Sequence, residues 1–499
     1  MLSLRLSLFL VLPGSAFVVA EPASAQTPSV DYDWLFPNEG LRTPASEQVP
    51  IVYVSRGQSR KEWEALPKFW NEGTEETVNP ATGEKQSRKL VRIKLPLGLN
   101  LIPTVPIENP LTVARWKLGK ELYFDSILCS DLTVSCATCH SPTFGYTDGK
   151  KVSDGIGGKK GGMSAPPVLN SAYNRQQFWD GRASSLEEQA QGPPQNDVEM
   201  FDGKGNAWHE VVKRVRAKPG YVKAFEREFG HAPTRDSIAK AIAAYERTVL
   251  VGNSINDRVE VAMQQRVEDE ESNKREILAK DYETVLKQAF ATKDTHALTA
   301  LKLDLAKDQE KIPEVAASIN RGRALYFGKA RCNTCHVGES LTDLAYHNLG
   351  VGVKDGKLPA ADLGRYGSLP TGHKDPSQIG AFKTPPLRGL LSTKPYMHDG
   401  SEDTLEKVVD FYDKGGNANE FLDAKMRDDE AEQAYMKAKA NRLYWKGPKV
   451  EVFTRDGRPV IPLKLNLTAD EKKDLVTFLL ALESDPVDAT VSDERWFPK

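Results

Sequence analysis

Four of the five cysteines in this chain occur in two copies of one pattern, C-x-x-C-H. Residues 136–140 read C-A-T-C-H and residues 332–336 read C-N-T-C-H. Five cysteines in 499 residues are too few for a disulfide scaffold. A structural zinc site takes four ligands, whereas each copy brings three together. A thioredoxin-like redox pair would not be expected twice, each time followed by histidine. These exclusions leave one chemistry that fits both copies.

C-x-x-C-H is the attachment pattern of c-type haem. The two thiols lie one helical turn apart and reach the two vinyl groups at one porphyrin edge, where they form thioethers. The histidine that follows places its imidazole on the iron. We therefore expect two covalently bound haem c groups, held by Cys136, Cys139 and His140 and by Cys332, Cys335 and His336.

The start of the chain has the organisation of an export signal. Arg5 precedes an apolar stretch from Leu6 to Val19, and the small residues of 23–25 follow it. This pattern predicts a signal peptide over residues 1–25 and a periplasmic protein, which suits covalent haem attachment. An uncleaved N-terminal anchor is the alternative, although Pro13 interrupts the stretch. No later run approaches about 18 apolar residues, so we expect no integral membrane span after cleavage.

Composition narrows the class of protein further. The chain has 67 basic and 69 acidic side chains, which give a formal net charge of −2. This balance argues against a nucleic-acid partner, because nucleic-acid binding needs clustered positive charge. Apolar residues make up 39% and charged residues 27%, as in ordinary globular proteins. The oligomeric state stays open, and a homodimer is compatible with the sequence.

The remaining sequence divides into four segments. Residues 26–107 are rich in proline, and an alternating apolar pattern at Lys89–Leu95 predicts a small β-containing N-terminal extension. Residues 108–253 and 319–490 each hold one haem pattern among helical signals, which predicts a mainly α fold with two cytochrome c-like domains. Residues 254–318 are dense in charge and predict a charged helical insertion, in the form of a solvated helical pair.

Particular residues predict where helices begin. Ser185 with Glu188 forms a capping-box pattern, and so does Thr468 with Glu471. The second pattern precedes apolar residues at helical spacing, Leu475, Phe478, Leu479 and Leu482.

The sixth coordination position decides whether a haem carries electrons or reacts. No histidine occurs between His140 and His209, and Met163 and Met200 are the thioethers in that interval. We therefore expect the first haem to be open to peroxide. Cys129 is outside both patterns, and we expect a buried small residue rather than a free reactive thiol.

Several further motifs, in the same order along the chain, resemble the bacterial dihaem cytochrome c peroxidase family, which includes the MauG-type enzymes. The resemblance covers about residues 108–253 and 319–485. The motifs are L-G-K-E-L-Y-F-D from Leu118, Q-F-W-D-G-R from Gln177, V-E-M from Val198, R-A-L-Y-F from Arg323, G-A-F-K-T-P from Gly380 and P-Y-M-H-D-G from Pro395.

The resemblance implies a division of labour between the two haems. The haem on His140 is similar to the peroxidatic haem, and the haem on His336 is similar to the electron-transfer haem. Glu199 matches the carboxylate that moves a proton between the peroxide oxygens. The other implied roles are distal-pocket residues at Gln189 and Pro193, an electron-coupling indole at Trp179 and a propionate partner at Arg182.

Two departures from ordinary family peroxidases favour the MauG-type branch. Enzymes that need reductive activation carry a histidine on the loop after the first motif, and residues 150–162 contain none. Ordinary members place a methionine eight residues after the start of a Thr-Leu pair, and here Thr404 leads to Tyr412. We therefore favour Tyr412 as the sixth ligand of the second haem, with Met397 as the competing candidate.

The resemblance also implies a calcium ion between the two haem domains. In the family an asparagine and two backbone carbonyls hold it, and the carbonyl positions match Thr393 and Pro395. The asparagine position corresponds to Ser164, which is a poorer oxygen ligand.

Together with the two haem motifs, the resemblance implies an enzyme that reduces hydrogen peroxide with electrons from a small cytochrome c or a cupredoxin. A MauG-like enzyme that oxidises a partner protein is the alternative with the same site. A non-catalytic dihaem electron carrier or redox sensor is the alternative from another class. It would require both irons to be six-coordinate with protein ligands, which the missing histidine after His140 argues against.

Overall fold

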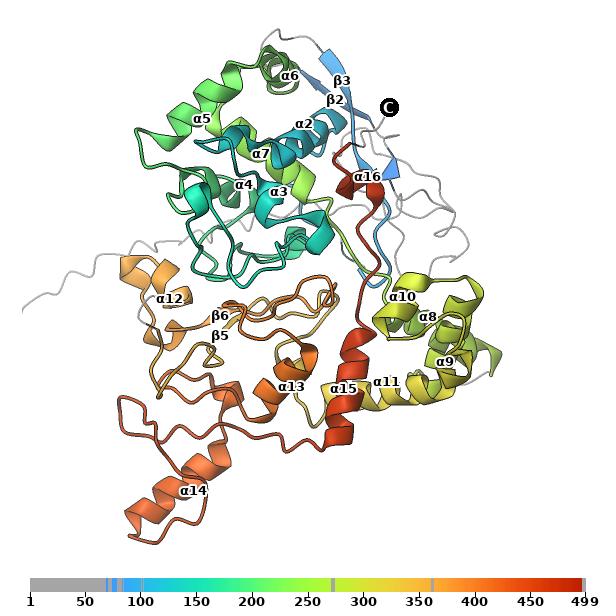
Figure 1. Cartoon of the computed structure of the whole chain (residues 1–499), viewed down its shortest axis with the longest axis vertical. Helices are drawn as coiled ribbons and strands as arrows, with labels where there is room; N and C mark the ends of the chain where they lie inside the picture. Colours follow the sequence, from blue (N-terminus) through green and yellow to red (C-terminus); the bar gives the residue numbers. More distant parts are fainter. Residues whose placement is uncertain are drawn as a thin grey trace, which may run out of the picture.

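The computed structural model describes residues 69–70, 74–78, 83, 85–99, 101, 103–270, 274–359 and 363–495. The expected signal peptide lies outside the described residues. The described chain is mostly helical, and its strands form three two-stranded sheets. Figure 1 shows the helices from α2 to α7 in one lobe and those from α11 to α15 in another.

Two crossing helices, α2 (Val113–Phe124) and α7 (Arg235–Glu246), form the centre of the first lobe. They approach closely because Gly119 has no side chain, since a Cβ there would lie 1.8 Å from the carbonyl oxygen of Ala241. The apolar core around them includes Trp116, Leu122 and Ile242. The other helices of this lobe are α3 (Cys136–Cys139), α4 (Leu186–Gln189), α5 (Ala207–Arg216) and α6 (Pro219–Phe229).

The second lobe repeats this arrangement with α11 (Ile312–Phe327) and α15 (Ala469–Leu480). Gly322 lies at the crossing, where a Cβ would be 2.0 Å from the carbonyl oxygen of Asp474. The predicted capping box at Thr468 is confirmed, and Leu475, Phe478, Leu479 and Leu482 are buried. The other helices here are α12 (Arg365–Ser368), α13 (Leu405–Asp413) and α14 (Asp429–Ala440), beside strands β5 (Tyr346–His347) and β6 (Phe382–Lys383).

The charged segment forms three helices, α8 (Ile255–Asp269), α9 (Ala279–Ala291) and α10 (Thr295–Ala300). The prediction of helices is confirmed, but the prediction of a solvated pair is wrong. Each helix turns apolar residues into the same core as α11, for example Val259, Tyr282 and Leu298. These apolar residues are widely spaced and separated by charged residues, so the sequence showed no clear apolar face on these helices.

The N-terminal extension is described in part. Strands β2 (Thr74–Val78) and β3 (Lys85–Lys89) form an antiparallel pair, and β1 (Phe69–Trp70) pairs with β4 (Arg92–Ile93). Val91, Ile93 and Leu95 are buried, as the alternation predicts, but β3 and β4 are separate strands and not one strand over 89–95.

The C-terminal segment returns to the first lobe. There α16 (Ala489–Ser492) accepts hydrogen bonds from Lys120 at Thr490 and from Tyr245 at Val491. The described 3₁₀ turns are Ser126–Leu128, Pro142–Phe144, Ile156–Gly158, Ser171–Tyr173, Pro193–Gln195, Gln309–Lys311, Cys332–Thr334, Thr371–His373, Pro376–Gln378 and Ala424–Met426.

Candidate active site

The two cysteines of the first haem motif lie on α3 and His140 follows at its end, and a segment with the Ser126–Leu128 turn connects α3 to α2. The Nδ1 atom of His140 is 3.3 Å from the carbonyl oxygen of Tyr146, and the Tyr123 hydroxyl donates to the His140 carbonyl at 2.7 Å. A hydrogen bond at Nδ1 leaves Nε2 as the nitrogen for a metal and fixes the ring orientation. Burial raises the pKa of the Cys136 thiol, and it raises the pKa of the Cys139 thiol to about 11.

The second motif is held in the same way. The Nδ1 atom of His336 is 3.0 Å from the carbonyl oxygen of Leu341, and Tyr326 donates to the His336 carbonyl at 2.6 Å. Burial lowers the pKa of His336 to about 4, so the ring is neutral at pH 7 and able to coordinate a metal. Burial also raises the pKa of the Cys332 thiol to about 12. The tyrosine-to-carbonyl bond therefore occurs in both lobes.

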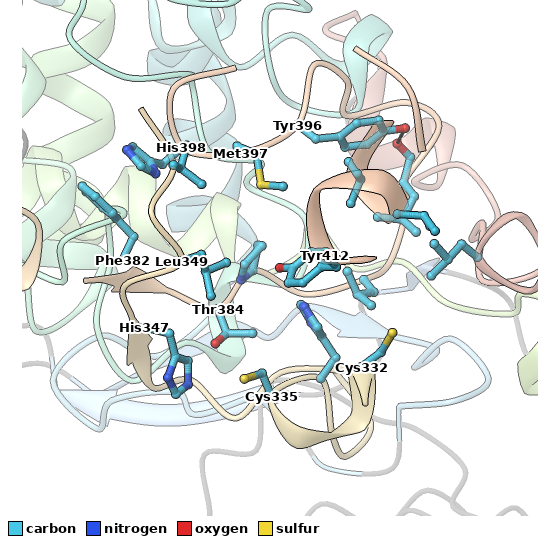
Figure 2. Close-up of a pocket in the computed structure, with 18 of the residues that line it drawn as sticks. Cys332, Cys335, His347, Leu349, Phe382, Thr384, Tyr396, Met397, His398 and Tyr412 are labelled. Atoms are coloured by element: carbon cyan, nitrogen blue, oxygen red, sulfur yellow. Dashed lines mark hydrogen bonds between the residues drawn. The ribbon is translucent and has the colours of Figure 1, made fainter. Parts of the chain in front are cut away.

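A cavity of about 210 Å³ lies on the His336 side of the molecule. Cys332, Cys335 and His336 are on its wall, together with the apolar side chains of Val351, Leu387, Val409, Leu465, Leu475 and Leu479. Figure 2 shows Cys332 and Cys335 with their sulfur atoms at one end of this space. None of the five cysteines forms a disulfide. Two unpaired thiols, a neutral imidazole and an apolar cavity together fit a covalently attached haem.

Both candidates for the sixth ligand of the second haem line this cavity. Tyr412 is on α13, and burial raises the pKa of its phenol. Met397 lies on the loop that precedes α13. In Figure 2 the Tyr412 ring lies between Met397 and the two cysteines. The structure therefore brings both residues to the site, and the choice of Tyr412 stays a prediction.

Glu199 lies beside the first haem motif. Its Oε1 atom accepts a hydrogen bond of 2.7 Å from the Asn196 side chain. Burial raises the pKa of Glu199, and the charge of nearby Arg182 partly opposes this effect. The carboxylate is close enough that its charge contributes to the raised pKa values of Cys136 and Cys139. A half-buried acid of this kind exchanges a proton nearer to neutral pH than an exposed one does.

The other residues predicted for this pocket surround Glu199 in sequence. Gln189 ends α4, and Pro193 begins the 3₁₀ turn that leads to Asn196. Both are half-buried, and their roles in the distal pocket stay predictions. Arg182 is exposed, pairs with Asp180 at 2.9 Å and stacks on the ring of Phe178, so its role as a propionate partner also stays a prediction.

Trp179 belongs to the first lobe but lines the cavity of the second. Its indole nitrogen donates to the Ser164 carbonyl at 2.9 Å, and its own carbonyl accepts from the backbone of Lys383 at 2.8 Å. The ring centroid lies 6.5 Å from that of His398, which stacks on Phe382 at 3.6 Å. A tryptophan with these contacts connects the two lobes directly.

The three residues predicted for calcium, Ser164, Thr393 and Pro395, all line the same cavity. Among the described residues, one group of three ligating His, Cys, Asp or Glu side chains is close enough to hold an ion, and it is elsewhere, at Cys335, Asp343 and His347. No carboxylate cluster therefore accompanies Ser164 in the described part of the chain, and calcium stays a prediction.

A charged network beside Cys335 was not predicted from the sequence. His347 is 2.7 Å from Asp423 and 3.0 Å from Asp343, and Lys425 is 3.1 Å from Asp343. Burial opposes the charge on His347, but its hydrogen bonds, above all the one with Asp423, raise its pKa to about 10. No single spacing pattern links these residues, because they come from two segments far apart in sequence, residues 343–347 and 423–425.

The structure also gives contacts to two motif residues that had no predicted role. Lys383, in G-A-F-K-T-P, donates from Nζ to the Gln176 carbonyl at 2.8 Å, and burial lowers its pKa to about 8. His398, in P-Y-M-H-D-G, is buried between the lobes. Both residues lie within motifs that resemble the peroxidase family, and this position in the sequence could have indicated that they matter.

Comparisons with known proteins agree with this geometry. A family model described as di-haem cytochrome c peroxidase matches residues 113–266. The cytochrome-c peroxidase IdrP1 of Pseudomonas sp. is 30% identical over 414 residues, which cover 77% of this chain and 86% of the relative. The methylamine utilization protein MauG of Methylorubrum extorquens is 34% identical over 327 residues, which cover 64% of this chain and 75% of the relative.

A solved structure is also similar over most of the chain. It is a MauG-like protein associated with microbial copper homeostasis, with 27% identity and a TM-score of 0.56. The match covers 81% of this chain and 98% of that structure. Since relatives at 30% identity or more are matched over most of their length, the chain belongs to the di-haem cytochrome c peroxidase and MauG family and is an oxidoreductase of the peroxidase type.

Proposed function

We propose that this protein is a periplasmic dihaem peroxidase that reduces hydrogen peroxide to water with electrons from a small cytochrome c or a cupredoxin. The observation that carries the proposal is the half-buried Glu199 beside the first haem motif, held by Asn196 and with a raised pKa. When bound, the haem groups would supply the iron at which peroxide reacts and the electrons that reduce it.

Glu199 performs the proton transfer in this proposal. The reaction consumes two protons and two electrons for each peroxide, and one peroxide oxygen must lose a proton while the other gains one. A carboxylate with a pKa nearer neutrality does both steps, because it accepts a proton and then returns it. The amide of Asn196 fixes Oε1, so the carboxylate keeps one orientation.

Trp179 couples the two haem domains in this proposal, which we take as residues 108–253 and 319–490. The two separate apolar clusters support this division, although the tail after residue 488 packs on the first lobe. Trp179 comes from the first domain and lines the cavity of the second, and this position supports a role in electron transfer from the second haem. The residues that would hold the haems are the two cysteines and the histidine of each motif.

A second candidate function is the oxidation of a partner protein, as the relatives named MauG suggest. The position of Tyr412 on the cavity wall favours it. A phenolate ligand stabilises ferric iron and lowers the potential of a haem relative to a thioether ligand. As the sixth ligand, Tyr412 would make the second site better suited to storing oxidising equivalents than Met397 would.

The test is a stopped-flow spectrum of the as-isolated diferric protein mixed with one equivalent of hydrogen peroxide. We expect a fast spectral change without prior reduction, and we expect Glu199→Gln to slow it by about 100-fold or more. Asp197→Asn is the matched control, since Asp197 is exposed in the same loop. An unchanged rate in Glu199→Gln would refute the proton-transfer role, and a wild type that reacts only after reduction would contradict the open first site.

A further inference from the structure

An arm at the outer edge of the second lobe plays no part in the proposed reaction. It consists of α14 and the loop that follows, and Figure 1 shows α14 projecting away from the helices of both cores. Residues 437–449, called the tip here, contain five basic residues and no acidic one. The basic residues are Lys437, Lys439, Arg442, Lys446 and Lys449.

The base of the arm is firmly attached. Arg427 forms two hydrogen bonds to Glu432, at 2.8 and 2.6 Å, and a third to the carbonyl oxygen of Pro459. Glu432 is buried and also accepts from the backbone of Ile461 at 2.9 Å. These bonds join the start of α14 to residues 459–461 on the returning side of the loop, so the arm presents its tip in a fixed direction.

The tip itself turns apolar side chains outward. The helix ends in a Schellman arrangement, in which Arg442 has a left-handed φ of 54° and the Leu443 amide donates to the Ala438 carbonyl at 2.8 Å. In such a motif the apolar residue after the helix usually packs back on the last turn. Here Leu443 is instead 65% exposed and Tyr444 is 87% exposed.

The aromatic residues behind the tip hold this conformation. The Trp445 ring packs edge-on against Tyr435 with centroids 5.5 Å apart, and its nitrogen donates to the Pro448 carbonyl at 2.7 Å. Tyr435 also contacts Phe453 on the returning side of the loop. Leu443 and Tyr444 are therefore exposed on a supported turn.

A favourable interaction with the helix dipole explains only two of the five basic residues at the tip. Lys437 and Lys439 lie in the last turn of α14, where positive charge is favourable. Arg442, Lys446 and Lys449 lie beyond the helix end, where this effect has vanished. A binding partner must accept both the cations and the two exposed apolar side chains.

The surface of an anionic phospholipid bilayer meets both requirements. Its phosphates attract clustered Lys and Arg, and its headgroup region takes up Leu, Tyr and Trp side chains. A protein partner of usual affinity needs a broad interface of about 800 Å² on each side, which suits a narrow projecting turn less well. We propose that the tip docks this protein on an anionic phospholipid surface, with Leu443 and Tyr444 in the headgroup region.

This docking would be peripheral. In the part of the chain that the structure describes, no helix is long and apolar enough to span a bilayer. Lys449 pairs with Glu451, which lies just beyond the tip, so the attraction depends on the other four basic residues. Each basic side chain near an anionic surface strengthens binding by about fivefold, so these four together are sufficient for measurable association.

The test is co-sedimentation of the holoprotein with vesicles of phosphatidylcholine and phosphatidylglycerol at a 7:3 ratio, in 50 mM NaCl. We expect binding that is lost in 500 mM NaCl and is absent with pure phosphatidylcholine vesicles. Reversing two charges in Arg442→Glu/Lys446→Glu should lower the partition coefficient by about 25-fold or more. Leu443→Ser/Tyr444→Ser should weaken binding while all charges are kept.

Matched controls exclude general charge and hydrophobic effects. Lys204→Glu/Lys213→Glu reverses two exposed charges on the first lobe, and Ile107→Ser removes a side chain that is 73% exposed. Both should bind vesicles like the wild type, and all variants should keep the haem spectrum and the peroxide reaction. The proposal is overturned if the wild type does not bind the anionic vesicles, or if the tip variants bind as well as the controls.

Discussion

The buried carboxyl group of Glu246 should make the folded protein less stable as the pH rises from 5 to 8. This residue ends α7, is 5% exposed, and its Oε2 atom has no hydrogen-bond partner among the described residues. Burial raises its pKa from the ordinary 4.5 to about 8, the neighbouring Arg247 opposes the shift, and Glu187 adds to it. Arg247 lowers the pKa of Glu246 only in part, because its guanidinium pairs with Glu187 at 2.7 Å.

The sign and size of the change in the free energy of unfolding with pH follow from proton linkage. Above pH 4.5 the unfolded chain loses this proton, while the folded protein keeps it up to about pH 8. The folded state then binds more protons, so stability falls as the pH rises through this interval and levels off above it. At about 1.4 kcal/mol per pH unit, the loss between pH 4.5 and pH 7 is about 3 kcal/mol. Glu246→Gln removes this loss because the amide does not ionise.

The assay is thermal unfolding of holoprotein followed by circular dichroism at several pH values. We expect Glu246→Gln to match the wild type at pH 5 and to unfold roughly 6–12 °C higher at pH 7, if the first lobe unfolds as one unit. Glu228→Gln is the control, and we expect it to lower the melting temperature. Glu228 pairs with the buried Arg115 at 3.1 Å, and its replacement leaves the charge of Arg115 without this partner. Parallel melting curves for wild type and Glu246→Gln at every pH would refute the reasoning.

Two further predictions concern helix packing and iron ligation. Gly119→Ala should cost about 1–3 kcal/mol or more in denaturant unfolding, since its Cβ would lie 1.8 Å from a backbone oxygen. Gly220→Ala should instead be neutral or stabilising, because nothing lies within 4 Å of a Cβ there, and equal losses for the two would contradict the packing argument. Tyr412→Phe should change the optical and EPR spectra of the second haem while Met397→Leu leaves them unaltered, and the reverse result would make Met397 the ligand.

Helices and their buried faces were the most predictable part of the fold. The capping box at Thr468 and the helical spacing after it depend on local chemistry, and the structure confirms both. The packing of α8, α9 and α10 into the second core was not predictable in the same way. Their apolar residues are few and separated by charge, and burial depends on α11, which lies later in the chain.

In the site, too, the features that are local in sequence could be predicted, and those that join distant segments could not. Both haem motifs are contiguous in sequence, so their residue types and spacing were sufficient to predict them. The network of His347 joins two segments that are far apart in sequence, one with Asp343 and one with Asp423, and no short pattern describes it. The same holds for the hydrogen bond from the Lys383 backbone to the Trp179 carbonyl, which depends on how the two lobes meet.

The two lobes repeat one architecture around their haem motifs. Each lobe uses a close helix crossing at a glycine, Gly119 or Gly322, and a tyrosine bonded to the carbonyl of the motif histidine. These features fix both histidines alike, so they cannot distinguish the two sites. The difference must come from residues outside the repeated framework, and connecting segments tolerate such change best.

Glu199 lies on such a segment, between α4 and α5, and Tyr412 lies on α13, which is not one of the crossing helices. Substitutions at the two glycines should therefore impair folding of the corresponding lobe before they affect chemistry. Substitutions at Glu199 or Tyr412 should change the reaction with peroxide or the haem spectrum while the melting temperature stays close to that of the wild type. If Glu199→Gln unfolded as readily as Gly119→Ala, this separation of framework from chemistry would be wrong.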